Sequence, residues 1–420
     1  MKGSLIKQHR KFKNLTLEDL AQGICSVSYL SKIEHNSINA SDEIYRLLGE
    51  RLSITLTDIN QKFDETIYEN LHQWHEAIQM RDFSIMKEYQ SYAEKALNKN
   101  QNIDLLNLYH IIQVRHNMTL NETSISKEKM KELKGIFPEA TAEYHFFYYK
   151  TVGLDFFING EIRDALDYFR KANQMMNKLP LEDSETYFHL SLAYSRTRSA
   201  VESNFYAEKA LEGYTNSLEY SKIIDSYTII AINYQILNAY DIAKDYFLKI
   251  LKVAKNHLNF IEKRRIFHNL GYININMENY TEALYYLYKA KDITTEDTEF
   301  NASTNYLLSL AHYYSGDREK CLDFIEIGEE EAKSNAALKY QHKFFILKNK
   351  LQETTHQMDF IAKLEQNIIP DLRNMNEYDD YKDNLELLGN LYYNKRMYKK
   401  ASMYFKEANN YKSTQKKDLL

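Results

Sequence analysis

Between residues 265 and 290, the apolar positions follow two successive helical patterns separated by a short polar turn at 277–279. Small and apolar residues recur at three- and four-residue spacing on both sides of this turn, which is the spacing of one helix face. They are, in chain order, Phe267, Leu270, Gly271, Ala283, Leu287 and Ala290. Two short helices cannot bury their apolar faces alone, so this pair needs neighbouring pairs.

The same arrangement recurs along the chain at a nearly constant interval. A small residue leads each pair and another follows twelve positions later, as Gly271 and Ala283 do. Successive leading residues are 38, 40, 40 and 38 positions apart, and a last step of 80 leaves room for a degenerate pair around 346–368. These leading residues are Gly153, Ser191, Ala231, Gly271, Ser309 and Gly389. With weaker pairs at about 70–100 and 103–137, we predict about nine pairs.

A repeat of this length, with small residues where two helices meet, resembles the tetratricopeptide repeat. The resemblance implies an all-α fold in which the pairs stack into a right-handed superhelix. Composition agrees, because 11 Gly and 3 Pro in 420 residues break few helices. A stack of repeats also grows along one axis, so it avoids the size limit of a single core.

The first 52 residues depart from this repeat. Their helical patterns are short, at about 3–13, 16–23, 27–35 and 41–52. Thr16 and Ser26 are positioned to cap the second and third helices, and Asp19 gives Thr16 a partial capping box. Leu30 and Ile33 have the spacing of a buried face. The stretch LTLEDLAQGICSVSYLSKIE closely resembles the phage-repressor type of helix-turn-helix.

Charge supports a DNA-binding role for this end. Residues 2–13 carry five basic side chains and no acidic one, whereas the whole chain has a net charge of −5. A solvated helix face is the alternative explanation of the basic run. The resemblance implies that the third helix enters the major groove. It places Ser26, Val27, Ser28, Tyr29, Ser31 and Lys32 within reach of DNA.

Two further features follow from the helix-turn-helix resemblance. Arg10 and Glu34 match positions that form a partly buried ion pair in phage-repressor domains. Leu17 stands where the family often has a Gln that contacts phosphate, so that contact is lost or replaced. The predicted domains are a helix-turn-helix domain at 1–56, a helical linker at 57–70, a repeat domain at 71–411 and a frayed tail at 412–420.

Other chemistry is poorly supported. His72 and His75 have helical spacing for two metal ligands, but no cluster completes a coordination shell, so we expect no metal. We find no phosphate-binding Gly loop and no nucleophile motif, so we expect neither an enzyme nor a cofactor. No run of 18 apolar residues exists, so no membrane span is expected. Two cysteines in separate domains favour a reducing cytoplasm.

A chain with a helix-turn-helix domain followed by about nine repeat pairs resembles the peptide-responsive quorum-sensing regulators of Gram-positive bacteria. These include the Rap, Rgg, PlcR, PrgX and neutral-protease regulators. The resemblance implies a homodimer or higher oligomer, a DNA operator and a short signalling peptide in the concave groove. It implies that the peptide switches DNA binding or oligomeric state. The alternative it leaves open is a Rap-like protein that binds a response regulator of the sporulation phosphorelay when free of peptide.

The superhelix places particular repeat positions on the concave side. Asn269 is the main candidate for contacting a peptide, because an amide can satisfy one backbone N–H and one C=O together. Its setting also resembles the Asn-x-Gly of Rap-type repeats. The remaining candidates supply charges and aromatic walls, and they are Arg265, His268, Tyr272, Lys150, Asp225, Gln235, Tyr306, Tyr313 and Asn390. The alternative is that these side chains serve packing, with Asn269 bonded to a neighbouring helix.

Overall fold

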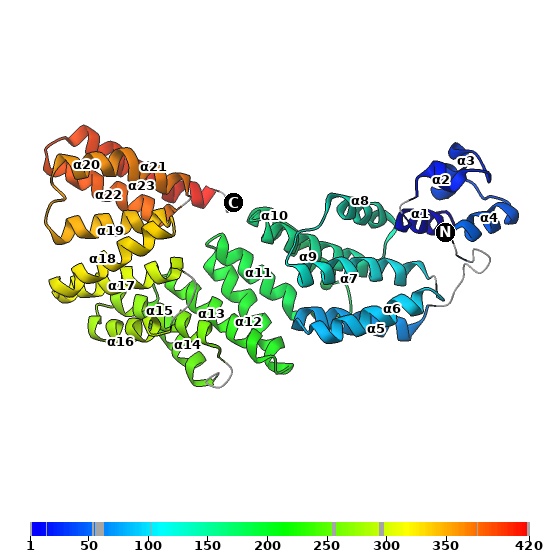
Figure 1. Ribbon diagram of the computed structural model, residues 1–420, viewed down its shortest axis with the longest axis horizontal. Helices are drawn as coiled ribbons and strands as arrows, with labels where there is room; N and C mark the ends of the chain where they lie inside the picture. The colour runs from blue at the N-terminus through cyan, green and yellow to red at the C-terminus, as the bar shows by residue number, and fades with distance from the viewer. Residues whose placement is uncertain are drawn as a thin grey trace. The chain divides into compact units, whose positions relative to one another are not determined.

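The computed structural model describes residues 2–13, 15–52, 54, 63–100, 102–253, 258–293, 298–375 and 377–417. Throughout these residues the regular secondary structure is helical, as predicted (Figure 1). The chain divides into two compact units, Met1–Asn233 and Tyr234–Leu420. The first unit contains the helix-turn-helix domain and the earlier repeats, and the second contains the later repeats.

Four short helices form the N-terminal domain. They are α1 (Lys2–Phe12), α2 (Leu17–Ala21), α3 (Val27–Glu34) and α4 (Asp42–Leu52). Thr16 and Asp19 form a full capping box at α2, because each side chain accepts a hydrogen bond from the other's backbone N–H. Ser26 caps α3 by accepting from the Tyr29 N–H. Both predicted caps are therefore present, and local sequence sets where these helices begin.

The first unit continues with the earlier repeats. Their helices are α5 (Glu65–Met80), α6 (Phe83–Leu97), α7 (Ile103–Asn121), α8 (Lys127–Ile136), α9 (Ala142–Ile158), α10 (Ile162–Met176), α11 (Ser184–Arg196), α12 (Ala200–Asn216) and α13 (Tyr220–Ile236). The boundary between the units falls inside α13, so its last three residues, 234–236, belong to the second unit. A single 3₁₀ turn, Phe137–Glu139, follows α8. The helices α5 to α8 confirm the two weaker pairs predicted at about 70–100 and 103–137.

The predicted linker at 57–70 differs from what the structure contains. Residues 57–62 lie outside the described residues. From Glu65 onward the chain is already the first repeat helix, α5, which the Asp64 carboxylate caps. Ile67 is buried in the core of the first unit. These residues therefore belong to the repeats, because an apolar side chain in this first turn packs against them.

The second unit contains the later repeats. Their helices are α14 (Tyr240–Val253), α15 (Phe260–Asn276), α16 (Tyr280–Lys291), α17 (Thr298–Ser315), α18 (Arg318–Ser334), α19 (Leu338–Leu351), α20 (Met358–Lys363), α21 (Ile369–Asn374), α22 (Tyr378–Asn394) and α23 (Tyr398–Lys417). If α20 and α21 are taken as one interrupted helix, the described helices after α4 follow one another as nine pairs. This number agrees with the prediction.

The helices depart from the predicted repeat pattern in two places. The degenerate pair has a second helix that is interrupted by a π turn, Leu364–Ile368, just before Pro370 in the first turn of α21. Proline has no N–H and clashes with the preceding turn, so the helix cannot continue regularly there.

At the C-terminus, the predicted tail is wrong for 412–417. These residues continue α23, in a stretch with no Gly or Pro to end the helix.

Small residues hold the two helices of a pair close together. A side-chain carbon placed on Gly271 would lie 2.4 Å from Leu287, and one on Gly153 would lie 2.8 Å from Phe169. In both cases the contacting residue is sixteen positions later. In a neighbouring repeat, Ser203 Oγ donates to the backbone carbonyl of Ser191 at 2.7 Å. The recurring small residues therefore exist because the helix backbones approach closely.

Candidate functional sites

The outer face of α3 carries the residues predicted to contact DNA. Leu30 and Ile33 are fully buried and anchor the opposite face of the helix. Four of the six predicted residues are exposed and two are half-buried. The exposed ones are Ser26, Val27, Ser28 and Lys32, and the half-buried ones are Tyr29 and Ser31. The sequence pattern thus separates the core face of α3 from a polar face that is free to meet a ligand.

One arginine holds α3 in the domain, and a second arginine, in α4, holds α2. The guanidinium of Arg10 donates to both carboxylate oxygens of Glu34 at 2.6 and 2.8 Å, and also to the Leu15 carbonyl. The Glu34 side chain is only 2% exposed, so this is the buried ion pair predicted from the sequence. Arg51 donates to backbone carbonyls around the end of α2, including that of Leu20. These contacts of Arg51 could not be predicted from the sequence, because in α4 it has the pattern of a surface residue.

Some of the basic side chains of α1 make contacts within the protein. Besides Arg10, Lys2 lies over the Tyr45 ring, with Nζ 4.5 Å from its centre. Lys11 faces Gly135 of α8, and burial lowers the pKa of its ammonium. Three of the five basic residues therefore support the domain or face the repeats. The local charge overstates the number of groups available for phosphate contact.

In the second unit, Asn269 and Gln235 form the centre of the predicted peptide site. Gln235 Nε2 donates to Asn269 Oδ1 at 3.4 Å, and Asn269 Nδ2 donates to the Arg265 carbonyl one turn earlier at 2.8 Å. The Arg265 side chain is exposed, and Tyr272 is 39% exposed on the same helix. Two amides from α13 and α15 are thus paired by one long bond, which a peptide backbone could replace.

His268 is held beside this amide pair. Its Nδ1 lies 3.1 Å from Thr304 Oγ1, and its ring lies against that of Phe300 with centroids 4.7 Å apart. Burial, together with the nearby Arg264, lowers the pKa of His268 to about 4. The imidazole is therefore neutral at neutral pH, and it packs α15 against α17 instead of carrying charge.

Tyr306 and Tyr313 line a cavity of about 350 Å³ in the same unit. Leu310 and Ile346 provide apolar walls, and Lys350 lines it as well. Tyr306 contacts the Phe344 ring edge-on, with ring centroids 5.7 Å apart. This cavity can take apolar side chains and also offers a cation for a carboxylate. The repeat positions predict the two tyrosines, but not Lys350, which comes from the degenerate pair.

Lys150 does not suit the role predicted for it. Its ammonium is buried in the first unit and contacts the carboxylates of Asp183 at 2.7 Å and Glu185 at 2.8 Å. Arg115 also donates to Glu185. A buried charge needs partners within the protein, and these two carboxylates supply them. Lys150 therefore joins α9 to α11 and is not presented to a peptide, which corrects the expectation from repeat position alone.

The remaining candidates are placed separately. Asp225 is exposed on α13 in the first unit, and Asn390 is exposed on α22 in the second.

His72 and His75, which were not expected to bind a metal, have structural partners. His72 Nε2 lies 2.8 Å from Glu143 Oε1, and the His75 ring packs edge-on against Phe147. In the described part of the chain, no helix is long and apolar enough to cross a membrane.

Comparison with known proteins finds sequence similarity to regulators. Residues 6–59 match the helix-turn-helix family. The transcriptional activator NprA of Geobacillus stearothermophilus is 24% identical over 398 residues, which is 92% of this chain and 97% of NprA. The response regulator aspartate phosphatase E of Bacillus subtilis strain 168 is 25% identical over 67% of this chain and 76% of its own length.

Solved structures show the same fold. The apo form of the quorum sensor NprR from B. thuringiensis superposes with a TM-score of 0.71 at 18% identity, covering 83% of this chain and 99% of NprR. NprR in complex with its cognate peptide NprX has a TM-score of 0.60 at 19% identity, over 82% and 98% of the two chains. These likenesses confirm the predicted all-α helical-repeat fold and the resemblance to the NprR and Rap group.

Proposed function

We propose that this chain is a DNA-binding transcriptional regulator that a short intracellular signalling peptide switches by binding to the repeats of the second unit. One observation carries the proposal. A helix-turn-helix domain with an exposed recognition helix is continuous in one chain with the fold of a quorum sensor that has been solved with its peptide. NprA, a transcriptional activator, aligns over both parts.

The amide pair suits an extended peptide. A short peptide without regular structure leaves its backbone N–H and C=O groups unpaired, and each unpaired group costs free energy when it is buried. Asn269 and Gln235 can exchange their single 3.4 Å bond for bonds to such a backbone. Tyr306, Tyr313 and Lys350 lie in the same unit, where their cavity can take an apolar side chain and a carboxylate.

The DNA-binding half of the proposal uses the polar face of α3. Ser28 and Lys32 are exposed there and can reach base edges and phosphates. One helix-turn-helix covers a short site, so we propose a homodimer that reads two half-sites. We propose no catalytic step for this chain, and we place its action in the cytoplasm, where an imported peptide would meet it.

Peptide capture tests the proposal directly. The tagged chain is purified from peptide-producing cells, and bound peptides are released and identified by mass spectrometry. We expect one short peptide in stoichiometric amount with wild type and about tenfold less with Asn269→Ala. Asn276→Ala is the matched control, because Asn276 lies on the same helix and makes the same bond to a carbonyl one turn earlier. Equal peptide retention by both variants would refute the assignment.

A second function is favoured by the phosphatase E relative, which is named for a response regulator. We propose, as the alternative, that the peptide-free chain binds a response regulator through its repeats. Co-purification of a response regulator that the peptide displaces, with no change in DNA binding, would favour this alternative over the first.

A further inference from the structure

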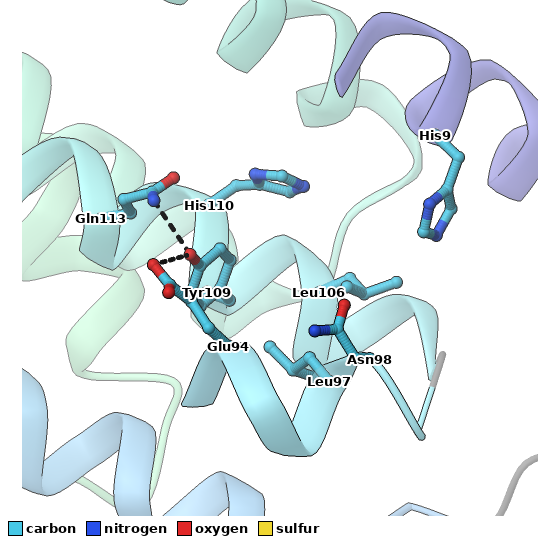
Figure 2. Close-up of a pocket in the computed structure, with 8 residues that line it drawn as sticks. All are labelled: His9, Glu94, Leu97, Asn98, Leu106, Tyr109, His110 and Gln113. Carbon is cyan, nitrogen blue, oxygen red and sulfur yellow. Dashed lines mark hydrogen bonds between the residues drawn. The ribbon is translucent and has the colours of Figure 1, made fainter. Parts of the chain in front are cut away.

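A second cavity lies where the helix-turn-helix domain meets the repeats (Figure 2). Its volume is about 360 Å³. One wall is His9 of α1, and the others come from α6 and α7 (Figure 2). Neither the DNA-contacting face of α3 nor the second-unit cavity includes any of these residues. This cavity is therefore separate from both proposed sites, and both parts of the first unit build it.

The inner surface of the cavity is apolar and aromatic. Leu97, Leu106 and Tyr109 are all at least nine-tenths buried and provide the apolar surface. The imidazoles of His9, from α1, and His110, from α7, lie near this surface (Figure 2). A flat aromatic ring fits such a surface, because it can lie on the apolar side chains and face the rings.

Hydrogen-bonding groups surround this apolar surface. Gln113 Nε2 donates to the Tyr109 hydroxyl at 2.9 Å, which donates to Glu94 Oε1 at 3.2 Å. The Asn98 amide also lines the cavity. Within the described residues, His9 Nε2 is buried and has no hydrogen-bond partner. Carboxylate, amide and imidazole groups in this arrangement favour a ligand that donates at least one N–H and accepts elsewhere.

The charges around the cavity disfavour an ionic ligand. Among the described lining residues there is no Lys or Arg, so an anion would face the Glu94 carboxylate without a cation. Burial lowers the pKa of His9 and of His110 to about 4. Lys13 adds to this lowering at His9, whereas at His110 the Glu132 carboxylate opposes it without overcoming it. An environment that opposes a charged imidazole also opposes a cationic ligand.

We propose that this cavity binds a small, uncharged, planar aromatic amine, of which adenine is the simplest natural example, as the free base or the nucleoside. Amide side chains pair with the amine and ring nitrogen of adenine in a bidentate way, and Asn98 and Gln113 offer such amides. An occupant that touches both α1 and α7 binds only when the two are in contact. It therefore stabilises the docking of the DNA-binding domain against the repeats.

The single tryptophan of the chain reports on this cavity. Trp74 is buried, and its ring lies 5.6 Å from that of Tyr109, which lines the cavity. The purified full-length chain is titrated with adenine, adenosine and adenosine monophosphate, with Trp74 excited where adenine does not absorb. We expect a saturable change in emission with adenine or adenosine, and weaker binding of the monophosphate.

Two substitutions locate the site. His9→Leu and Gln113→Leu keep side-chain bulk but remove a hydrogen-bonding group, so each should weaken binding by about tenfold. His35→Leu is the matched control, because His35 is an exposed histidine of the same domain outside the cavity. Absence of a saturable change with wild type overturns the proposal. So does tighter binding of the monophosphate than of adenosine, or wild-type affinity in both cavity variants.

Discussion

Glu34 is a buried carboxylate whose charge is matched by one arginine. Because Arg10 holds both of its oxygens, Glu34→Gln leaves the guanidinium without a full partner in a buried position. We expect a loss of about 3 kcal/mol in the stability of the helix-turn-helix domain. Hydrogen exchange should show this loss in the amides of α1 to α3, with the repeats unaffected.

The control for this prediction is Glu43→Gln. The Glu43 carboxylate pairs with Arg46 on the surface, where both side chains are at least half exposed. Such exposed pairs contribute little to stability, so little change is expected. If Glu34→Gln and Glu43→Gln had the same small effect, the ion pair would not hold α1 and α3 together.

His268 links the stability of the second unit to pH. Its pKa is about 4 in the folded chain, below the ordinary value of about 6.5. Between these values the unfolded chain binds the proton and the folded chain does not, so stability falls as pH decreases. From about pH 6.5 to pH 5 this contribution amounts to about 2 kcal/mol. Urea unfolding of wild type and His268→Asn at both pH values measures it.

In that experiment the variant should show a shallower pH dependence than wild type. His356→Asn, which replaces an exposed histidine of the same unit, controls for the loss of an imidazole. An identical pH slope in wild type and His268→Asn would mean that the surroundings of this half-buried imidazole do not oppose its protonation.

At the residue scale, sequence reasoning worked where the partners lie within one recognisable motif. Arg10 and Glu34 could be paired because the helix-turn-helix resemblance relates their positions. Lys150 could not, because its partners Asp183 and Glu185 come from the next repeat, and burial decides its role. Repeat position indicates which way a side chain points, but not whether a neighbouring helix already covers it.

Helix pairs depend on their small residues. In Gly271→Ala the new methyl group would lie 2.4 Å from Leu287, so the pair α15–α16 must separate or repack. Overpacking of this kind costs about 1–3 kcal/mol, which exceeds the gain of roughly 1 kcal/mol in helix propensity. We expect net destabilisation by up to about 2 kcal/mol in chemical unfolding, and partial recovery when Leu287→Ala is added.

Gly135→Ala is the matched control on α8. Its nearest contact is the flexible end of Lys11, at 2.9 Å, which can move aside. The helix-propensity gain should then dominate, and stability should stay the same or rise. Destabilisation of both variants by the same amount would show that close helix contact is not what requires Gly271.

At the element scale, periodicity predicts most of the fold. The spacing of small residues located the pairs, and Thr16 and Ser26 located two helix starts, because these signals are local. The π turn before Pro370 and the extension of α23 to Lys417 were missed. A proline can end a helix or be accommodated within it, and neighbouring packing decides which occurs.

At the scale of the whole molecule, the proposed DNA-binding and peptide-binding sites differ in chemistry and lie in different units. The α3 face lies in the first unit, and the paired amides and the tyrosine-lined cavity lie in the second. A regulator of this design requires the two sites to be coupled in free energy, so that peptide binding changes DNA affinity. Sequence alone could identify the two parts, but not the cavities, because each forms from helices that are distant in the sequence.

The affinity of the chain for DNA with and without its peptide tests this account most directly. A duplex is enriched from a random pool by the wild-type chain, and its Kd is measured with and without the co-purifying peptide at fixed salt. We predict that the peptide changes Kd by about 5–150-fold in wild type and in Asn276→Ala, and by less than about twofold in Asn269→Ala. The same Kd in wild type with and without the peptide would contradict the account.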